Sequence, residues 1–178
     1  DPTIDTAAAN ATVQCDGQGN TAALAAWLAS NGGAVASDAC SNVTWTNNYT
    51  ELSDGCGNTG SASVTFTATD SCGNTSTCQA VIEILDTIDP TITCPADTLT
   101  LECDADGDST VQGNVLIANW LASATATDAC SGAGVTHNYS PTGYSDGCGA
   151  TGLQTVTFTA TDSCGNTSTC QAVVEILD

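Results

Sequence analysis

Apolar and polar side chains alternate at every second position along the longest regular segments of the chain. From 64 to 69, valine, phenylalanine and alanine alternate with threonines, and from 80 to 85 alanine and isoleucine alternate with valine, glutamate and leucine. A period of two is typical of a β-strand with one buried face. Shorter strands are expected at 98–102, 124–127 and 135–139. The pattern predicts an all-β protein.

Two segments depart from this period. Within 21–30, apolar residues lie at positions i, i+3 and i+4, and the same spacing recurs at 117–121. This spacing predicts a short helix with one apolar face in each half of the chain. Trp27 and Trp120 lie on those faces, and we expect them to fill the core rather than to stack on sugars.

The chain is an internal repeat. The sequence VTFTATDSCGNTSTCQAV occupies 64–81 and returns unchanged at 156–173, and the Asp-Pro-Thr-Ile that opens the chain returns at 89–92. Such a repeat predicts two domains, 1–86 and 87–178. Short strands, turns rich in glycine and aspartate, and one inserted helix per copy favour tandem immunoglobulin-like β-sandwiches.

The charge of the chain excludes several functions. It has 20 acidic residues, no lysine or arginine and a single histidine, which gives a formal charge of −20. Nucleic-acid binding and phosphoryl transfer both need cationic side chains, so neither is expected. A Ser-His-Asp or Cys-His site could be built only around His137, and we expect no enzyme. No apolar run is long enough to span a bilayer, so no membrane insertion is expected.

Eleven cysteines in 178 residues indicate a disulfide framework. Such frameworks form in oxidising compartments, so we expect a secreted or cell-surface protein. Structural zinc is disfavoured because no Cys-x2-Cys pair occurs, and such pairs are the usual spacing of zinc ligands.

The motifs that carry these cysteines resemble a known family. They are Asp-Pro-Thr-Ile-Thr-Cys-Pro at 89–95, Thr-Asp-Ala-Cys at 127–130 and Thr-Ala-Thr-Asp-Ser-Cys-Gly-Asn-Thr-Ser-Thr-Cys at 159–170. This set resembles hyalin (HYR) repeats, and more closely the cysteine-rich HYR-like repeats of large bacterial adhesins of the Bacteroidetes type. The resemblance covers both halves. It implies an extracellular immunoglobulin-like module with structural or adhesive duties and no catalysis.

The topology of such a sandwich suggests how the cysteines pair. The first strand starts and the last strand begins at the entry end of a domain, and two loops lie beside them there. The pairs expected on this basis are Cys94–Cys170, Cys130–Cys164 and Cys103–Cys148 in the second repeat, with Cys15–Cys56 and Cys40–Cys72 in the first. Cys78 is left over because Thr6 occupies the position of its partner. It is either a free buried thiol or a bond to another chain.

The negative charge favours a divalent cation, and calcium suits oxygen ligands from carboxylates and amides. A junction site is expected from the linker and the entry loops of the second repeat, with Asp86, Asp89, Asp128, Asp162 and Asn166 as ligands. The equivalent set of the first repeat is Asp1, Asp38, Asp70 and Asn74, with Asp178 of a neighbouring molecule. The alternative is that these residues are turn and cap residues that face water.

A second calcium candidate lies in the second repeat. Asp104, Asp106 and Asp108 alternate in an Asp-x-Asp-Gly-Asp segment that resembles calcium loops, without the distal glutamate of an EF-hand. Glycans are a further possible partner, since Asn-x-Ser/Thr sequons and Asp-Ser/Thr-hydrophobic triplets both occur.

These features leave two hypotheses of function. The first is a structural or adhesive module of a bacterial surface fibre, stiffened by calcium and disulfides and assembled head to tail from identical copies. It is either a slice of a long adhesin or a filament subunit. The second hypothesis is a ligand- or carbohydrate-binding module of a secreted multidomain protein, which would need an exposed aromatic platform.

Overall fold

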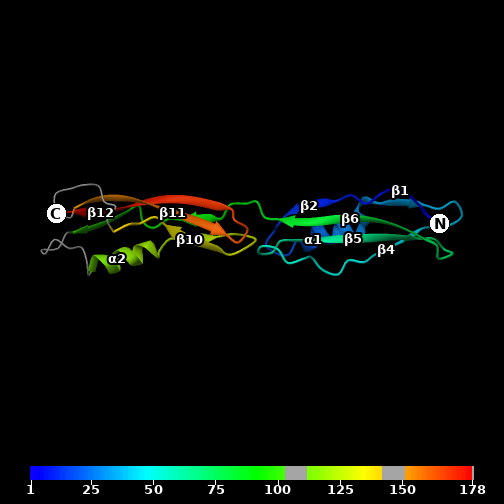
Figure 1. Cartoon of the computed structure of the whole chain (residues 1–178), viewed down its shortest axis with the longest axis horizontal. Coiled ribbons are helices and arrows are strands. Elements are labelled where there is room, and N and C mark those ends of the chain that lie inside the picture. Colours follow the sequence, from blue (N-terminus) through cyan, green and yellow to red (C-terminus); the bar gives the residue numbers. More distant parts are fainter. Residues whose placement is uncertain (103–111, 142–150, 178) are drawn as a thin grey trace. The chain divides into compact units, whose positions relative to one another are not determined.

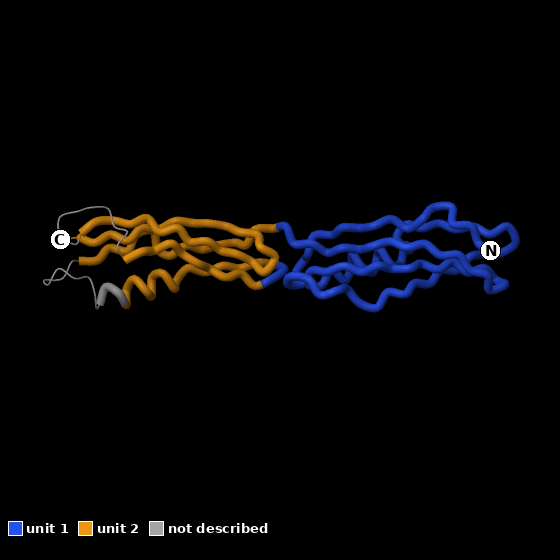
Figure 2. The backbone as a smooth tube through the Cα atoms, viewed as in Figure 1, with its two compact units in different colours: residues 1–87, 129–131 blue, residues 88–128, 132–178 orange. Residues whose placement is uncertain are grey.

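The chain forms two compact all-β units in a computed structural model that describes residues 1–102, 112–141 and 151–177. Unit 1 comprises Asp1–Thr87 together with Ala129–Ser131, and unit 2 comprises Ile88–Asp128 and Gly132–Asp178 (Figure 2). The boundary at Thr87 lies one residue from the boundary expected from the repeat. The short segment Ala129–Ser131, which belongs to unit 1 although the second repeat encodes it, was not expected.

Unit 1 contains six strands, an α-helix and a short 3-10 helix (Figure 1). In chain order they are β1 (Thr3–Thr6), β2 (Ala11–Gln14), α1 (Thr21–Ala29), η1 (Asn31–Gly33), β3 (Val35–Ser37), β4 (Thr44–Asn47), β5 (Gly60–Thr69) and β6 (Thr75–Leu85). One sheet has the order β2-β6-β5-β4, and β1 pairs with β3 in a second, two-stranded sheet.

Unit 2 repeats this arrangement. Its elements are β7 (Thr91–Thr93), β8 (Thr98–Glu102), α2 (Gln112–Leu121), β9 (Thr125–Thr127), β10 (Ala133–His137), β11 (Gly152–Asp162) and β12 (Thr167–Leu177). The sheet orders are β10-β11-β12-β8 and β7-β9. In each unit the last strand pairs in parallel with an early strand, β2 with β6 and β8 with β12, whereas the other pairs are antiparallel. The two immunoglobulin-like sandwiches predicted from the sequence are confirmed.

The strands bury the alternate residues that the sequence predicts. Val64, Phe66 and Ala68 of β5 have no exposed surface, and Ile82 and Ile84 of β6 are almost as fully buried. β5 begins at Gly60, earlier than the expected residue 64, and β11 begins at the aligned Gly152. In β5 those extra residues are small, so the strand is specified there by its backbone pairing with β6 and not by hydrophobic alternation.

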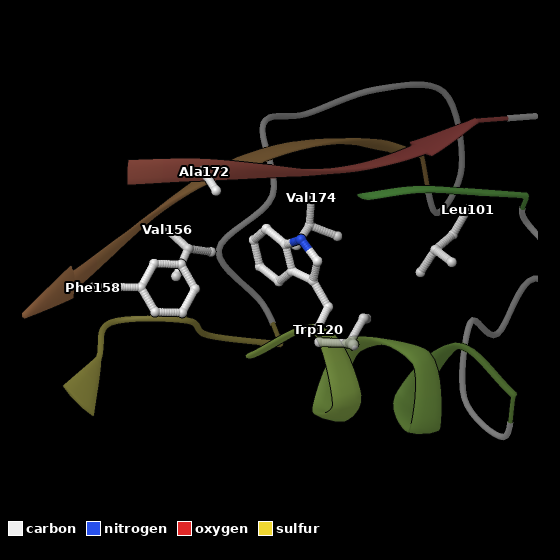
Figure 3. Close-up of a cluster of buried hydrophobic side chains, with 7 residues drawn as sticks. Leu101, Trp120, Val156, Phe158, Ala172 and Val174 are labelled. Carbon is white, nitrogen blue, oxygen red and sulfur yellow. The ribbon is translucent and has the colours of Figure 1, made fainter. Parts of the chain in front are cut away.

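The inserted helices close each core with a tryptophan. Trp120 of α2 is 7% exposed and meets Phe158 of β11 edge to face, with ring centroids 5.6 Å apart (Figure 3). Trp27 of α1 meets Phe66 in the same geometry at 5.2 Å. Each indole also donates a hydrogen bond to a backbone oxygen, Trp120 to that of Ala96 at 3.1 Å. Both tryptophans therefore serve the core, as predicted.

Candidate functional site

The β5–β6 and β11–β12 turns place an aspartate in the same geometry in both units. Oδ1 of Asp70 accepts hydrogen bonds from the backbone N–H groups of Cys72 and Asn74, both at 2.9 Å. Its Oδ2 accepts from the Asn74 side-chain amide at 2.8 Å. The turn closes because Gly73 adopts a φ of +89°, a conformation that favours glycine. These carboxylates therefore organise the turns. The alternative interpretation expected turn residues that face water, but Asp70 and Asp162 are buried, at 8% and 6% exposed.

The same hydrogen bonds set the ionisation of the two carboxyl groups. The side-chain amide of Asn74 and the backbone donors of the turn hold the pKa of Asp70 below its usual value. For Asp162, burial raises the pKa, but the hydrogen bonds from Asn166, Cys164 and Gly165 outweigh it and the net pKa is lowered. Both groups are anionic at neutral pH, which is the form that binds a cation.

In unit 1 the loop that carries Asp38 lies beside the Asp70 turn. Oδ1 of Asp38 accepts from the Cys40 backbone N–H at 2.9 Å and from the Ser41 hydroxyl at 3.2 Å. The Ser41 hydroxyl in turn accepts from the Ser71 backbone N–H at 3.3 Å. The structure thus brings the Asp38 and Asp70 loops together, as expected for the entry end of the first repeat.

The other predicted ligands differ in exposure. Asp86 is 9% exposed and accepts a hydrogen bond from the Gln14 side-chain amide at 3.3 Å, whereas Asp128 is half-buried. Asp1 and Asp89 are exposed. Asp104, Asp106, Asp108 and Asp178 lie outside the described residues.

The donor set suits an oxygen-binding cation. The described residues with metal-ligand chemistry include Asp86, Asp128 and Asp162, together with Cys130 and Cys164. Both of these cysteines are disulfide-bonded, so they supply no thiolate. Carboxylate and amide oxygens remain, and these are the ligands that calcium prefers and zinc does not require.

The disulfides follow the expected framework only in part. Cys94 is bonded to Cys170 with a Cα–Cα distance of 5.9 Å, which is the expected pair. Cys56 and Cys164 are also disulfide-bonded. The expected Cys103–Cys148 pair lies outside the described residues.

Three expected pairs are wrong. Cys15 is bonded to Cys130, with a Cα–Cα distance of 5.8 Å, and this excludes both Cys15–Cys56 and Cys130–Cys164. Cys40 and Cys72 are both free and exposed, so they do not bond each other. The expectation failed because it assumed that every bond closes within one repeat. Cys130 instead belongs to unit 1 through the segment Ala129–Ser131, which we call the docked segment.

The docked segment is held at one end of unit 1. The backbone N–H of Asn58 donates to the Cys130 oxygen at 3.0 Å, and Cys15, Cys130 and Ile84 form a buried cluster against Leu52. Cys15 directly follows β2. Its backbone N–H donates a hydrogen bond to the backbone oxygen of Leu85, the last residue of β6. The sequence analysis did not predict this surface of unit 1, because the residues that contact Cys130 are far apart in the chain and carry no motif.

Cys78 forms no disulfide within the described part of the chain. It is half-buried and packs against the core of Val64, Phe66 and Ala80. Its counterpart Cys170 bonds Cys94, and Thr6 holds the equivalent position in the first repeat.

The described residues of unit 2 also form an open groove of about 630 Å³ between α2 and the β9–β10 edge. It is lined mainly by alanines, with Leu121 and Val135, and His137 contributes its ring. His137 lies edge to face against Phe158 with ring centroids 6.0 Å apart. A groove with so little aromatic surface is a poor platform for stacking sugars, and His137 is better explained by strand packing.

No protein-family model matches the chain, and no curated protein matches its sequence. Among solved structures it is similar to Drosophila N-cadherin EC1-4, at 12% identity and a TM-score of 0.39, over 99% of this chain and 49% of that one. It is also similar to Sidekick-1 immunoglobulin domains 1–4, at 11% identity and a TM-score of 0.39, over 99% and 49% of the two chains. The chain thus spans about half the length of these two fragments. No helix in the described part of the chain has the length and hydrophobicity needed to cross a bilayer.

Proposed function

We propose that the chain is a structural and adhesive module of a secreted bacterial surface fibre, built from HYR-like repeats and assembled head to tail. The observation that carries this proposal is the docked segment. A loop encoded by the second repeat belongs to unit 1, where its Cys130 is buried and bonded to Cys15. A repeat that holds the loop of the following repeat in this way is suited to carry load along a fibre.

The similarity of the two repeats supports head-to-tail assembly. The internal linker joins Leu85-Asp86 to Asp89-Pro90, and both flanks recur in the other repeat, as Leu177-Asp178 and Asp1-Pro2. In this proposal the exit end of the second repeat accepts the entry loop of the first repeat of another molecule, as unit 1 accepts Ala129–Ser131 within the chain. Because such a contact joins two different surfaces, it does not close on itself and generates an open filament.

Calcium would reduce the repulsion between molecules of charge −20. The anionic Asp70 and Asp162, and the neighbouring acidic loops, provide oxygen ligands with no lysine or arginine to compete. In this proposal Asp86, Asp89, Asp128, Asp162 and Asn166 bind calcium at the linker. At the joint between molecules, Asp178 of one copy and Asp1, Asp38 and Asp70 of the next form the equivalent site.

Sedimentation and electron microscopy of the chain in calcium and in chelator test this function. We expect filaments in calcium and shorter assemblies in chelator. The double variant Asp1→Asn/Asp178→Asn should shorten the filaments, whereas the charge-matched control Asp54→Asn/Asp97→Asn should not. Filaments of undiminished length in the first variant would exclude the calcium-bridged joint, and a monomer under every condition would exclude assembly itself.

A further inference from the structure

The open groove of unit 2 is lined by Val135, and the first repeat has a tryptophan at the same structural position. Val135 of β10 lies opposite Ala160 of β11, and Trp45 of β4 lies opposite Ala68 of β5. Ala68 and Ala160 are one position of the unchanged repeat. Trp45 and Val135 are therefore equivalent residues of the two sandwiches.

A pair of matching hydrogen bonds confirms that β4 and β10 have the same register. The backbone N–H of Thr65 donates to Oδ1 of Asn48, and that of Thr157 donates to Oδ1 of Asn138, each over 2.8 Å. The indole in unit 1 and the valine in unit 2 each pack against the buried core of their own unit. At this position unit 2 therefore lacks the volume of an aromatic ring system that unit 1 contains.

The connection between helix and strand differs in the same region. Ser30 and Ser123 each donate a hydroxyl hydrogen bond to the last tryptophan oxygen of their helix. In the first repeat the three residues of η1 separate Ser30 from Ala34, whereas Ala124 directly follows Ser123. Ala34 is 7% exposed, but Ala124 is half-buried and lines the groove. Unit 2 thus leaves open a surface between helix and strand that is covered in unit 1.

The lining of the groove sets the chemistry of what it can hold. Its volume of about 630 Å³ lies within the usual range of small-molecule sites. Thr125 and His137 are the two lining residues whose side chains can form hydrogen bonds, and none of the lining residues is acidic, although the chain has 20 acidic residues. The groove is therefore an apolar, uncharged surface on a strongly anionic protein.

We propose that this groove binds a small, neutral, planar aromatic molecule of the indole or phenol class, at the position that the Trp45 side chain holds in unit 1. An apolar cavity left by a shortened side chain can bind an aromatic molecule that replaces the missing group. Such a molecule carries one hydrogen-bonding group, which suits the few polar side chains of the lining, whereas a sugar with many hydroxyls would leave most of them unpaired.

The charge of the protein selects a neutral ligand. An anion is repelled by the net charge of −20, and a cation finds no carboxylate among the lining residues. A neutral ring gains from the removal of its apolar surface, and that of the groove, from water. This site lies within unit 2 and does not depend on the proposed head-to-tail assembly.

Titration of the isotopically labelled full chain with indole, followed by amide chemical shifts, tests the site. We expect saturable shifts in α2, β9 and β10, no shifts in β3 and β4, and a Kd on the order of millimolar, as the few atoms of indole allow. The anion indoleacetate should bind more weakly than indole. The cation tryptamine should bind no more tightly than indole, since tighter binding would show attraction to the net charge and overturn the choice of a neutral ligand.

Val135→Trp reproduces the side chain of unit 1 and should weaken indole binding by about tenfold or more, because the new ring occupies the groove. Val35→Trp is the matched control, since it adds the same ring at a β3 valine that is 53% exposed, and it should leave the affinity unchanged. Ala118→Trp obstructs the groove from an exposed helix position and should also weaken binding. It replaces Val135→Trp in the test if circular dichroism shows that the latter is unfolded.

Three results would overturn the site. They are the absence of saturable shifts up to the solubility limit of indole, shifts spread equally over both units, and undiminished affinity in a folded Val135→Trp or Ala118→Trp chain. The filament test by sedimentation and electron microscopy does not involve this groove. Loss of indole binding with filaments retained would therefore reject this inference alone, and indole binding by a chain that stays monomeric would reject assembly alone.

Discussion

The side-chain amide of Asn166 donates a hydrogen bond to Oδ2 of Asp162 over 2.8 Å, and Asn74 makes the same bond to Asp70 in unit 1. Backbone donors of the turn bind the other oxygen of each carboxylate. The turn is thus built around a charged acceptor, and hydrogen bonds to a charged group are stronger than those between neutral groups.

Replacing Asn166 by alanine should lower the stability of unit 2 at neutral pH, because the Asp162 carboxylate loses a donor. The hydrogen bonds lower the pKa of Asp162 in the folded state below the ordinary value of 3.8. Their stabilisation is therefore present above that value and lost as the pH falls through the folded-state pKa. The difference in urea midpoint between Asn166→Ala and the native chain should shrink below pH 3.8. Asn42→Ala, at an exposed position, is the control, and a difference that is constant with pH would contradict the argument.

The core of unit 2 depends on the contact between Trp120 and Phe158. Phe158 has no exposed surface, so Phe158→Ala leaves a cavity and should lower the free energy of unfolding by about 3–5 kcal/mol. Val115→Ala, at a helix position that is 59% exposed, should change it by less than about 0.5 kcal/mol. Hydrogen exchange should show loss of protection in β11 and β12 and unchanged protection in β5 and β6. Equal loss in both units would show that they do not unfold separately.

The regular elements were predictable because hydrophobic alternation is a local property of the sequence. The alternate positions of β5 and β6 are those that the structure buries, and the tryptophan spacing located both helices. The Asp70 and Asp162 turns could be placed from sequence, but whether they bind cations or cap turns could not. The hydrogen bond from Asn166 to Asp162 shows the turn role directly, and cation binding would use the remaining lone pairs of the same carboxylate.

The disulfide pairing was only partly predictable for a related reason. Cys94–Cys170 follows from sandwich topology, since the strands that carry these cysteines are placed by the fold itself. Cys15–Cys130 spans 115 residues and depends on the docked segment, a tertiary contact between sequence repeats. Topology rules for a single domain contain no information about such a bond.

Calcium binding at the proposed linker site should stabilise the chain by mass action. At a calcium concentration about one hundred times the Kd, the gain is about 2.7 kcal/mol. Asp128→Asn/Asp162→Asn should lose most of the calcium-dependent rise in thermal midpoint, whereas Asp54→Asn/Asp97→Asn, with the same change in charge, should retain it. Calorimetric titration of both variants would check the result. An equal loss in the control would show that calcium only screens the net charge.

The half-buried Cys78 allows a missing disulfide to be restored. Cys78 lies opposite Phe66 in the β5–β6 pair, as Cys170 lies opposite Phe158 in the β11–β12 pair. Cys170 bonds Cys94 over a Cα–Cα distance of 5.9 Å, and Thr6 holds the position of Cys94 in the first repeat. The repeat therefore provides the geometry for a bond in unit 1 and lacks only the second sulfur.

Thr6→Cys should form a disulfide with Cys78 and raise the free energy of unfolding of unit 1 by about 2–4 kcal/mol. The gain arises mainly because the bond restricts the unfolded chain, and it should disappear in reductant. Thr3→Cys is the matched control, since Thr3 is also an exposed threonine of β1 but aligns with Thr91 and not with a cysteine. Intact mass should show the loss of two hydrogens in Thr6→Cys relative to its reduced form, and peptide mapping should recover the 6–78 pair. If both thiols react freely with an alkylating reagent in the folded protein, the first strand of unit 1 does not follow the path of its counterpart.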